Sequence, residues 1–254
     1  MNASRTSVIR RFSAFALAAP LALGLAACND VEGGGGEIAG DPIAAIPAPE
    51  GTSWTATVTV TEEDGYKLGN PDAPIKLVEY ASHTCPACAS FSASAKPDLR
   101  DQYVASGVVS FEQRNLVRDP IDLSIATLVR CGQKENMQPL SDQAWASLND
   151  FFSNVNANSA QYEASAQLPL DQRFVAIAEA AGLIEFFSAR GLSADQARSC
   201  LADTEKMEAI DENSKAQAEE LNVTGTPTFF LNGNKIDGIS WNEIEPALQR
   251  AGAR

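Results

Sequence analysis

Two cysteines with two residues between them form the first candidate reactive site of this chain, Cys85-Pro86-Ala87-Cys88. Sulfurs at this spacing can form and break a disulfide, so the pair can exchange two electrons without a cofactor. If the motif begins a helix, the free backbone N–H groups there favour a thiolate and lower the pKa of Cys85. Pro86 suits the first helical position, because its missing N–H would be unpaired there. The motif therefore indicates thiol–disulfide chemistry.

Two other interpretations of the motif are open at this stage. Half of a zinc site is one, but zinc needs about four ligands, and the sequence has one histidine, His83, and no second CxxC. A short structural disulfide is the other. Redox chemistry is favoured over both because a strand, the motif and a helix follow one another in the order that thioredoxin-like motifs require. We expect no metal and no organic cofactor.

The elements around the motif predict a βαβ unit. Residues 75–80 are almost continuously apolar, which is typical of a buried strand, and the cysteines follow directly. Helix formers with apolar spacing predict a helix over 89–103, and residues 108–116 predict the next strand. An alternating segment at 55–60 predicts a further strand. A strand, a helix and a strand in this order imply parallel pairing within an α/β sheet.

The remainder of the chain is mostly helical and ends with a hairpin and a final helix. Asn232-Gly233-Asn234 lies between short apolar runs at 228–231 and 235–237, which is a hairpin signal. Residues 241–251 predict the closing helix. Between the two sheet regions, helical patterns predict helices at 121–131, 142–152, 171–181, 194–202 and 205–221.

Residues 1–27 have the form of an export signal. Three arginines precede an apolar run over 12–27, which is short for a membrane span. The run ends in LAAC at 25–28, which resembles the bacterial lipobox, so we expect a lipid on Cys28; ordinary cleavage that leaves Cys28 incidental is the alternative. Residues 28–53 are rich in Gly, Ala and Pro and predict a flexible tether. We therefore expect a membrane-anchored lipoprotein of the periplasm.

The net charge of the chain is strongly negative. It amounts to −14 at pH 7. An acidic surface repels phosphates, so the charge argues against nucleic acid as a partner.

A longer pattern around the motif resembles the DsbA-type thiol–disulfide oxidoreductases. It consists of GNPDAP at 69–74, LVEYAS at 77–82 and TCPAC at 84–88, and VTGTPT at 223–228 is similar to the cis-proline loop of the same thioredoxin superfamily. The resemblance implies a thioredoxin-like α/β fold over 54–254 with an inserted all-helical subdomain at about 119–221.

The resemblance also implies roles for the matching residues at the sulfurs. Cys85 would be the attacking cysteine and Cys88 the resolving one. Glu79, six residues before Cys85, aligns with a buried acid of the family and would exchange a proton with Cys88. The alternative for Glu79 is a solvated carboxylate, but its strand is otherwise apolar, which favours the buried role.

Substrate would bind beside the sulfurs in this family. Thr226 and Pro227 match the substrate-binding loop and its cis peptide bond, with Pro86 and Ala87 on the motif itself. At the position of Ala87 the strong oxidants of the family carry histidine, whose charge stabilises the thiolate and makes the enzyme more oxidising. Ala87 supplies no polar group, and His83 could supply charge from another side or be a packing residue.

The other two cysteines, Cys131 and Cys200, lie in predicted helices without CxxC spacing. We expect a structural disulfide between them, which resembles an arrangement in some family members. The expected activity is the introduction of disulfides into exported proteins, with a reductase or isomerase on the same scaffold as the rival. A non-catalytic, metal-binding lipoprotein is the rival from another class. The implied partners are exported proteins with free thiols or disulfides and a membrane redox partner, such as a quinone-linked oxidase, that reoxidises Cys85 and Cys88.

Overall fold

The structure is a computed structural model, and it describes residues 40–254. The expected export signal and Cys28 lie outside these residues. Among the described residues, no helix is long and apolar enough to cross a membrane. Six strands form one sheet in the order β1-β2-β4-β3-β5-β6. The strands are β1 (Val58–Val60), β2 (Tyr66–Leu68), β3 (Ile75–Ala81), β4 (Val109–Asn115), β5 (Thr228–Leu231) and β6 (Asn234–Ile236).

The centre of the sheet is the expected βαβ unit. Strands β3 and β4 pair in parallel, and helix α1 (Pro86–Asp98) followed by the π-helical turn η2 (Leu99–Val104) connects them. Strand β5 pairs antiparallel with β3 on its other side. The α/β thioredoxin-like fold implied by the sequence is therefore confirmed, and β3 delivers the chain to the motif from the middle of the sheet.

The two faces of β3 contact different helices. Leu77 packs in one core with α1 and the closing helix α10 (Trp241–Arg250). Tyr80 packs on the opposite face with Ala218 of helix α9 (Thr204–Glu220). Because side chains alternate along a strand, Glu79 lies on the same face as Leu77, under α1.

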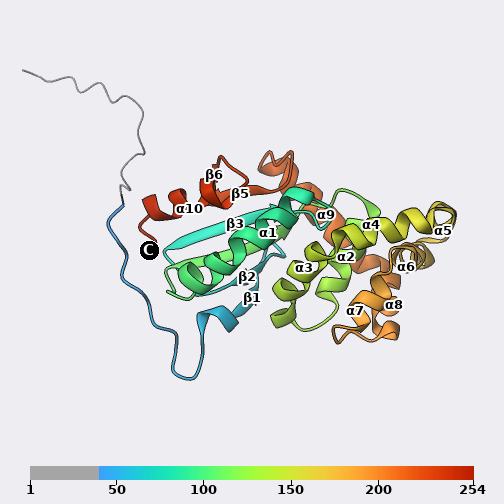
Figure 1. The fold of residues 1–254 in the computed structure, drawn as a ribbon, viewed down its shortest axis with the longest axis horizontal. Coiled ribbons are helices and arrows are strands. Elements are labelled where there is room, and N and C mark those ends of the chain that lie inside the picture. The colour runs from blue at the N-terminus through green and yellow to red at the C-terminus, as the bar shows by residue number, and fades with distance from the viewer. Residues whose placement is uncertain (1–39) are drawn as a thin grey trace, which may run out of the picture. The chain divides into compact units, whose positions relative to one another are not determined.

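The helical block lies between the two halves of the sheet in the sequence and has a hydrophobic core of its own. Figure 1 shows its helices gathered beyond one end of the strands. Helix α9 returns to the sheet, where it contacts β4, and α3 (Met137–Ala146) contacts β2. The first seven helices of the block are α2 (Pro120–Arg130), α3 (Met137–Ala146), α4 (Leu148–Ala157), α5 (Ser159–Ser165), α6 (Leu170–Ala180), α7 (Leu183–Ser188) and α8 (Ala194–Ala202).

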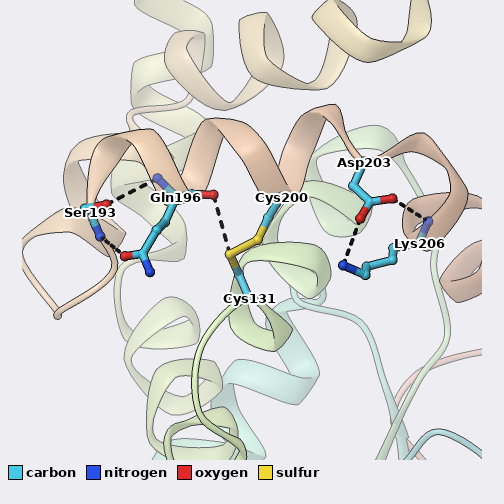
Figure 2. The surroundings of a disulfide bond; sticks show 6 residues. All are labelled: Cys131, Ser193, Gln196, Cys200, Asp203 and Lys206. Atoms are coloured by element: carbon cyan, nitrogen blue, oxygen red, sulfur yellow. Dashed lines mark hydrogen bonds and ion pairs between the residues drawn. A yellow bond between two sulfur atoms is a disulfide. The ribbon is translucent and has the colours of Figure 1, made fainter.

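A disulfide between Cys131 and Cys200 joins two of these helices. Cys131 directly follows α2, and Cys200 lies within α8. Figure 2 shows the bridge beside the start of α8, where Ser193 and Gln196 form a capping box. The bridge thus fixes the C-terminal end of α2 inside the helical block.

Several expected elements differ in the structure. The expected strand at 55–60 begins as a short 3₁₀ helix, η1 (Trp54–Ala56), and only Val58–Val60 pairs as a strand. The expected helix at 142–152 is two helices that meet at Ser147. Apolar spacing continues across Ser147, so periodicity alone does not reveal the change of direction.

The last part of the expected tether lies against the folded body. The Ile43 N–H donates to the Gly252 carbonyl at 2.9 Å, and the Ile46 N–H donates to the Ser106 carbonyl at 2.8 Å. The Trp54 indole N–H donates to the Ile46 carbonyl at 2.7 Å. The Gly, Ala and Pro composition that predicts a flexible tether gives no sign of these backbone contacts.

Candidate active site

Cys85 lies at the start of helix α1. It is the N-cap residue, with φ −92° and ψ 117°, and Pro86 begins the helix. The Cys85 Sγ accepts a hydrogen bond from the Cys88 N–H at 3.5 Å. Both cysteines are free, and Cys85 is only 3% exposed. The strand-to-helix junction therefore holds the Cys85 sulfur against unpaired backbone donors, as the sequence predicted.

The loop of Thr226 and Pro227 lies directly opposite Cys85. Its Thr226–Pro227 bond is cis, and the Cys85 Sγ lies 3.2 Å from the Thr226 carbonyl oxygen. The buried Thr226 hydroxyl has no hydrogen-bond partner among the described residues. The carbonyl can accept the proton of a thiol, whereas the hydroxyl can donate to a thiolate, so this loop interacts with both forms of Cys85.

Hydrogen bonds stabilise the thiolate of Cys85. The Cys88 thiol lowers the pKa of Cys85 most, and the Thr226 side chain and the Cys88 and Ala87 N–H groups lower it further. Burial acts in the opposite direction, and the resulting pKa of Cys85 is about 5. At neutral pH the sulfur is therefore an anion, which is the form that reacts in thiol–disulfide exchange.

Cys88 has the opposite character. It is fully buried, and burial raises the pKa of Cys88 far above its ordinary value, with further increases from Cys85 and from the charge of Glu79. Cys88 therefore stays protonated, and its thiol donates a hydrogen bond to the Cys85 thiolate. This asymmetry matches the attacking and resolving roles that the resemblance implied.

Glu79 lies buried beneath the motif. It is 0% exposed, and neither carboxylate oxygen has a hydrogen-bond partner among the described residues. Burial raises the pKa of Glu79 to about 7; Lys96 lowers it, and the charges of Asp142 and Cys85 raise it. A carboxyl group with this pKa can hold or release a proton at neutral pH, which is what proton exchange with Cys88 requires.

A buried lysine beside Glu79 was not predicted from the sequence. Lys96 of α1 is 6% exposed, and its Nζ donates to Gln113 at 3.0 Å and to Asp142 at 2.7 Å. Gln113 is the β4 residue paired with Glu79. Lys96 is the first charged residue of helix α1, after a run of small and apolar side chains. This isolated charge is the sequence feature that could have indicated a buried lysine.

His83 is a buried residue and not a surface charge. It is 0% exposed, and its ring stacks on Trp145 with centroids 5.1 Å apart. Its Nε2 lies 3.0 Å from the Ser141 hydroxyl. The main groups that stabilise the Cys85 thiolate belong to the motif and the Thr226 loop. Backbone and thiol donors therefore supply the stabilisation that the Ala87 side chain cannot give.

Residues next to the Cys85 sulfur are exposed on the surface. Pro86 and Gly225 are exposed, and Ala87 is partly exposed. A cavity of about 550 Å³ between α1, β1 and α3 reaches Lys96 and Asp142 but neither cysteine of the motif. The exposed residues beside Cys85 are therefore accessible to an extended chain on the surface. Within residues 40–254, no cluster of three His, Cys, Asp or Glu is arranged to hold a metal.

Comparison with known proteins decides the family. Residues 61–250 match the family model described as Thioredoxin. The chain belongs to the thioredoxin family. A Rickettsia bellii protein named as a protein-disulfide oxidoreductase is 26% identical over 203 residues, which are 80% of this chain and 70% of that protein. The DsbA-type thiol–disulfide oxidoreductase that the resemblance implied is thereby confirmed.

Solved structures of this family share the fold. The crystal structure of a protein-disulfide isomerase from Novosphingobium aromaticivorans superposes with a TM-score of 0.68 at 28% identity, covering 72% of this chain and 95% of that chain. Wolbachia pipientis alpha-DsbA1 gives a TM-score of 0.60 at 21% identity, covering 73% of this chain and 89% of that chain. The chain is an enzyme of thiol–disulfide exchange.

Proposed function

We propose that this enzyme oxidises pairs of thiols in exported proteins through a Cys85–Cys88 disulfide. A substrate thiolate attacks the Cys85 sulfur, the Cys85–Cys88 bond breaks, and Cys88 leaves with the electron pair and takes up a proton. A second substrate thiolate then attacks the substrate sulfur of the mixed disulfide, and Cys85 leaves as a thiolate. The substrate loses two electrons and two protons, and the enzyme gains the two electrons.

The geometry at Cys85 supports this direction of electron flow. A sulfur stabilised as an anion is a good leaving group, and a stabilised reduced form makes the disulfide a stronger oxidant. Cys85 receives that stabilisation from the Cys88 side chain and amide at the start of α1. Glu79 would exchange the proton of Cys88, and Thr226, Pro227, Pro86 and Ala87 would contact the substrate backbone.

The redox equilibrium with glutathione tests the proposal. The purified chain is equilibrated with defined ratios of reduced and oxidised glutathione, and its ability to refold a reduced, disulfide-containing protein is followed. We expect an oxidising equilibrium and catalysed refolding, both abolished in Cys85→Ser and in Cys88→Ser. The matched control, Cys131→Ser with Cys200→Ser, should retain both. A strongly reducing potential would overturn the oxidase assignment.

An isomerase or reductase is the second candidate. The Novosphingobium protein of known structure is named an isomerase, and the same two sulfurs could reduce or rearrange disulfides. An isomerase would restore activity to a substrate with scrambled disulfides without added oxidant, whereas an oxidase would act on the reduced substrate and would need an oxidant to turn over.

We also propose that the enzyme works in the periplasm, attached to a membrane by a lipid on Cys28. The support is the basic and apolar leader that ends in LAAC. A membrane redox partner would then accept the two electrons and restore the Cys85–Cys88 disulfide. Fractionation tests the anchor: Cys28→Ser should release the protein from the membrane fraction, and an unchanged distribution would contradict lipidation.

A further inference from the structure

The three residues before Cys85 are all held by side chains of the helical block. The Ser82 carbonyl accepts the Trp145 indole N–H at 2.9 Å. The His83 backbone N–H donates to Asp122 Oδ1 at 2.7 Å, and the Thr84 hydroxyl donates to Asp119 Oδ2 at 2.5 Å. Because Asp119 and Asp122 belong to the start of α2 and Trp145 to α3, two helices of the block fix one short turn.

This turn determines where Cys85 lies. The Cys85 N–H donates to the Ser82 carbonyl at 3.2 Å, which closes residues 82–85 into a turn. The Ser82 carbonyl is the same oxygen that Trp145 binds. A displacement of the turn would therefore move the Cys85 sulfur relative to the Cys88 N–H, whose 3.5 Å contact is already long, and hydrogen bonds weaken steeply with distance and angle.

Asp122 makes the central contact of this arrangement. Its side chain is fully buried, and both of its oxygens are used by backbone donors: Oδ1 by His83 and Oδ2 by the Arg118 N–H at 3.0 Å. Oδ1 also lies 3.5 Å from the His83 Nδ1. A buried carboxylate with its acceptors satisfied by backbone N–H groups keeps those groups in one place, since leaving them unpaired costs about 1–3 kcal/mol each.

We propose that Asp122 is a positioning residue of the redox site, which holds the turn of residues 82–85 so that the Cys85 sulfur faces the Cys88 amide and the Thr226 loop. His83 is the second part of the device, since its ring is held between Trp145 and the Ser141 hydroxyl. The inference rests on the proposed function and adds that the helical block sets the redox properties of Cys85.

The test compares three variants with the wild type. Asp122→Asn replaces one acceptor by an NH₂ group that faces an N–H donor. His83→Phe keeps a ring on Trp145 and the backbone N–H bond to Asp122, but loses the Ser141 hydrogen bond and the approach of the imidazole Nδ1 to Asp122. Ile177→Val is the control, because it shortens a buried side chain in the core of the helical block and lowers stability without contact to the turn.

Two measurements are made on each variant: the pH profile of Cys85 alkylation and the equilibrium constant with glutathione. For Asp122→Asn we expect the alkylation midpoint to rise by about one pH unit and the equilibrium to shift roughly tenfold toward the enzyme disulfide. His83→Phe should change the alkylation midpoint and the equilibrium constant in the same direction but by less, and Ile177→Val should change neither quantity. If Asp122→Asn does not fold, the same two quantities are compared between His83→Phe and the wild type.

Unchanged alkylation and equilibrium in Asp122→Asn or, where it does not fold, in His83→Phe would overturn the inference, because the contacts of the helical block with residues 82–85 would then not affect Cys85. The alkylation measurement needs no substrate protein. If the wild type fails to refold substrates, the proposed function is overturned. If Asp122→Asn nevertheless shifts the alkylation midpoint and the glutathione equilibrium relative to that wild type, this inference stands.

Discussion

At the scale of single residues, the chemistry depends on unequal environments for two sulfurs three positions apart. Cys85 is surrounded by donors and Cys88 by apolar side chains, so the pKa of Cys85 is lowered to about 5 while burial raises that of Cys88. At neutral pH Cys85 is therefore a reactive thiolate, whereas Cys88 remains a protonated thiol. The difference arises from position along one helical turn, since the residue type is the same.

The first prediction concerns the pH dependence of Cys85. Because its pKa in the folded, reduced protein is lowered, the thiolate stabilises that form at pH values above the ordinary thiol pKa, and this stabilisation is lost as the pH falls through about 5. We expect alkylation of Cys85 in the Cys88→Ala variant and in the wild type to be fast at pH 7 and to decline in acid. The variant lacks the Cys88 thiol donor, so its midpoint should be higher than that of the wild type.

Rapid quenching with iodoacetamide across pH 3–9, followed by mass spectrometry, gives both midpoints. A wild-type midpoint near the ordinary thiol value of about 8.5 would contradict the assignment of Cys85 as the attacking cysteine.

The second prediction concerns the buried charge of Glu79. Its pKa is raised from 4.5 to about 7 in the fold, so the protein loses stability as the pH rises from about 4.5 to about 7, and the loss is complete above pH 7 and absent below the unfolded value. Glu79→Gln should therefore raise the free energy of unfolding of the reduced protein at pH 8 by roughly 3 kcal/mol and change it little at pH 4.

Urea unfolding at the two pH values measures this difference, and Glu245→Gln, on helix α10, is the control for loss of a carboxylate. The same Glu79→Gln variant should slow turnover by about 10²-fold if the carboxyl group exchanges the Cys88 proton. Equal stability gains at both pH values would show that the pKa of Glu79 is not raised in the fold.

At the scale of elements, local sequence signals predicted some elements well. The turn Asn232-Gly233 joins β5 and β6 with both residues at positive φ, 49° and 81°, as Asn-Gly between short apolar runs indicates. Strand β3 and the helix start at Pro86 were also predictable, because a buried parallel strand and an N1 proline have strong local signatures. These signals placed Cys85 and Cys88 at a strand-to-helix junction, whereas the Thr226-Pro227 loop was identified by its resemblance to the family.

Other features depend on contacts between distant segments and have no local signature. Strand β2 has three residues and forms only because it pairs with β1 and β4. Asp122 and Lys96 look like ordinary helical charges in the sequence, and only the fold buries them beside the motif. The sequence thus predicts the reacting sulfurs, but not the polar side chains that surround and position them.

The third prediction tests the hairpin with two glycines. A Cβ would meet no atom within 4 Å at either Gly233 or Gly132, but only Gly233 has a positive φ, 81°. Gly233→Ala should therefore lower the free energy of unfolding by about 1 kcal/mol through backbone strain alone. Gly132→Ala, the matched control, should be neutral or slightly stabilising. Thermal unfolding of both variants decides, and equal melting temperatures would contradict the left-handed turn.

At the scale of the whole folded body, the redox site lies where two hydrophobic cores meet. One core joins the sheet to α1 and α10, and the other lies within the helical block. A small cluster of Ala81, Cys85, Cys88 and Trp145 lies between them. The sheet and α1 supply the sulfurs, and the helical block supplies Trp145 and the carboxylates that hold the approach to Cys85. The block therefore completes the site in addition to covering it.

The last prediction separates the stability of the helical block from the chemistry of the site. The Cys131–Cys200 disulfide spans 69 residues, and a loop of this length contributes roughly 4 kcal/mol in the chain-entropy model. The double variant Cys131→Ser/Cys200→Ser should lose about that much in urea unfolding. Its equilibrium with glutathione at Cys85 and Cys88 should be unchanged, because the bridge lies at the opposite end of α2 from Asp122. A changed equilibrium constant would mean that the bridge also acts on the redox site through α2, and an unchanged stability would mean that the disulfide contributes nothing to the fold.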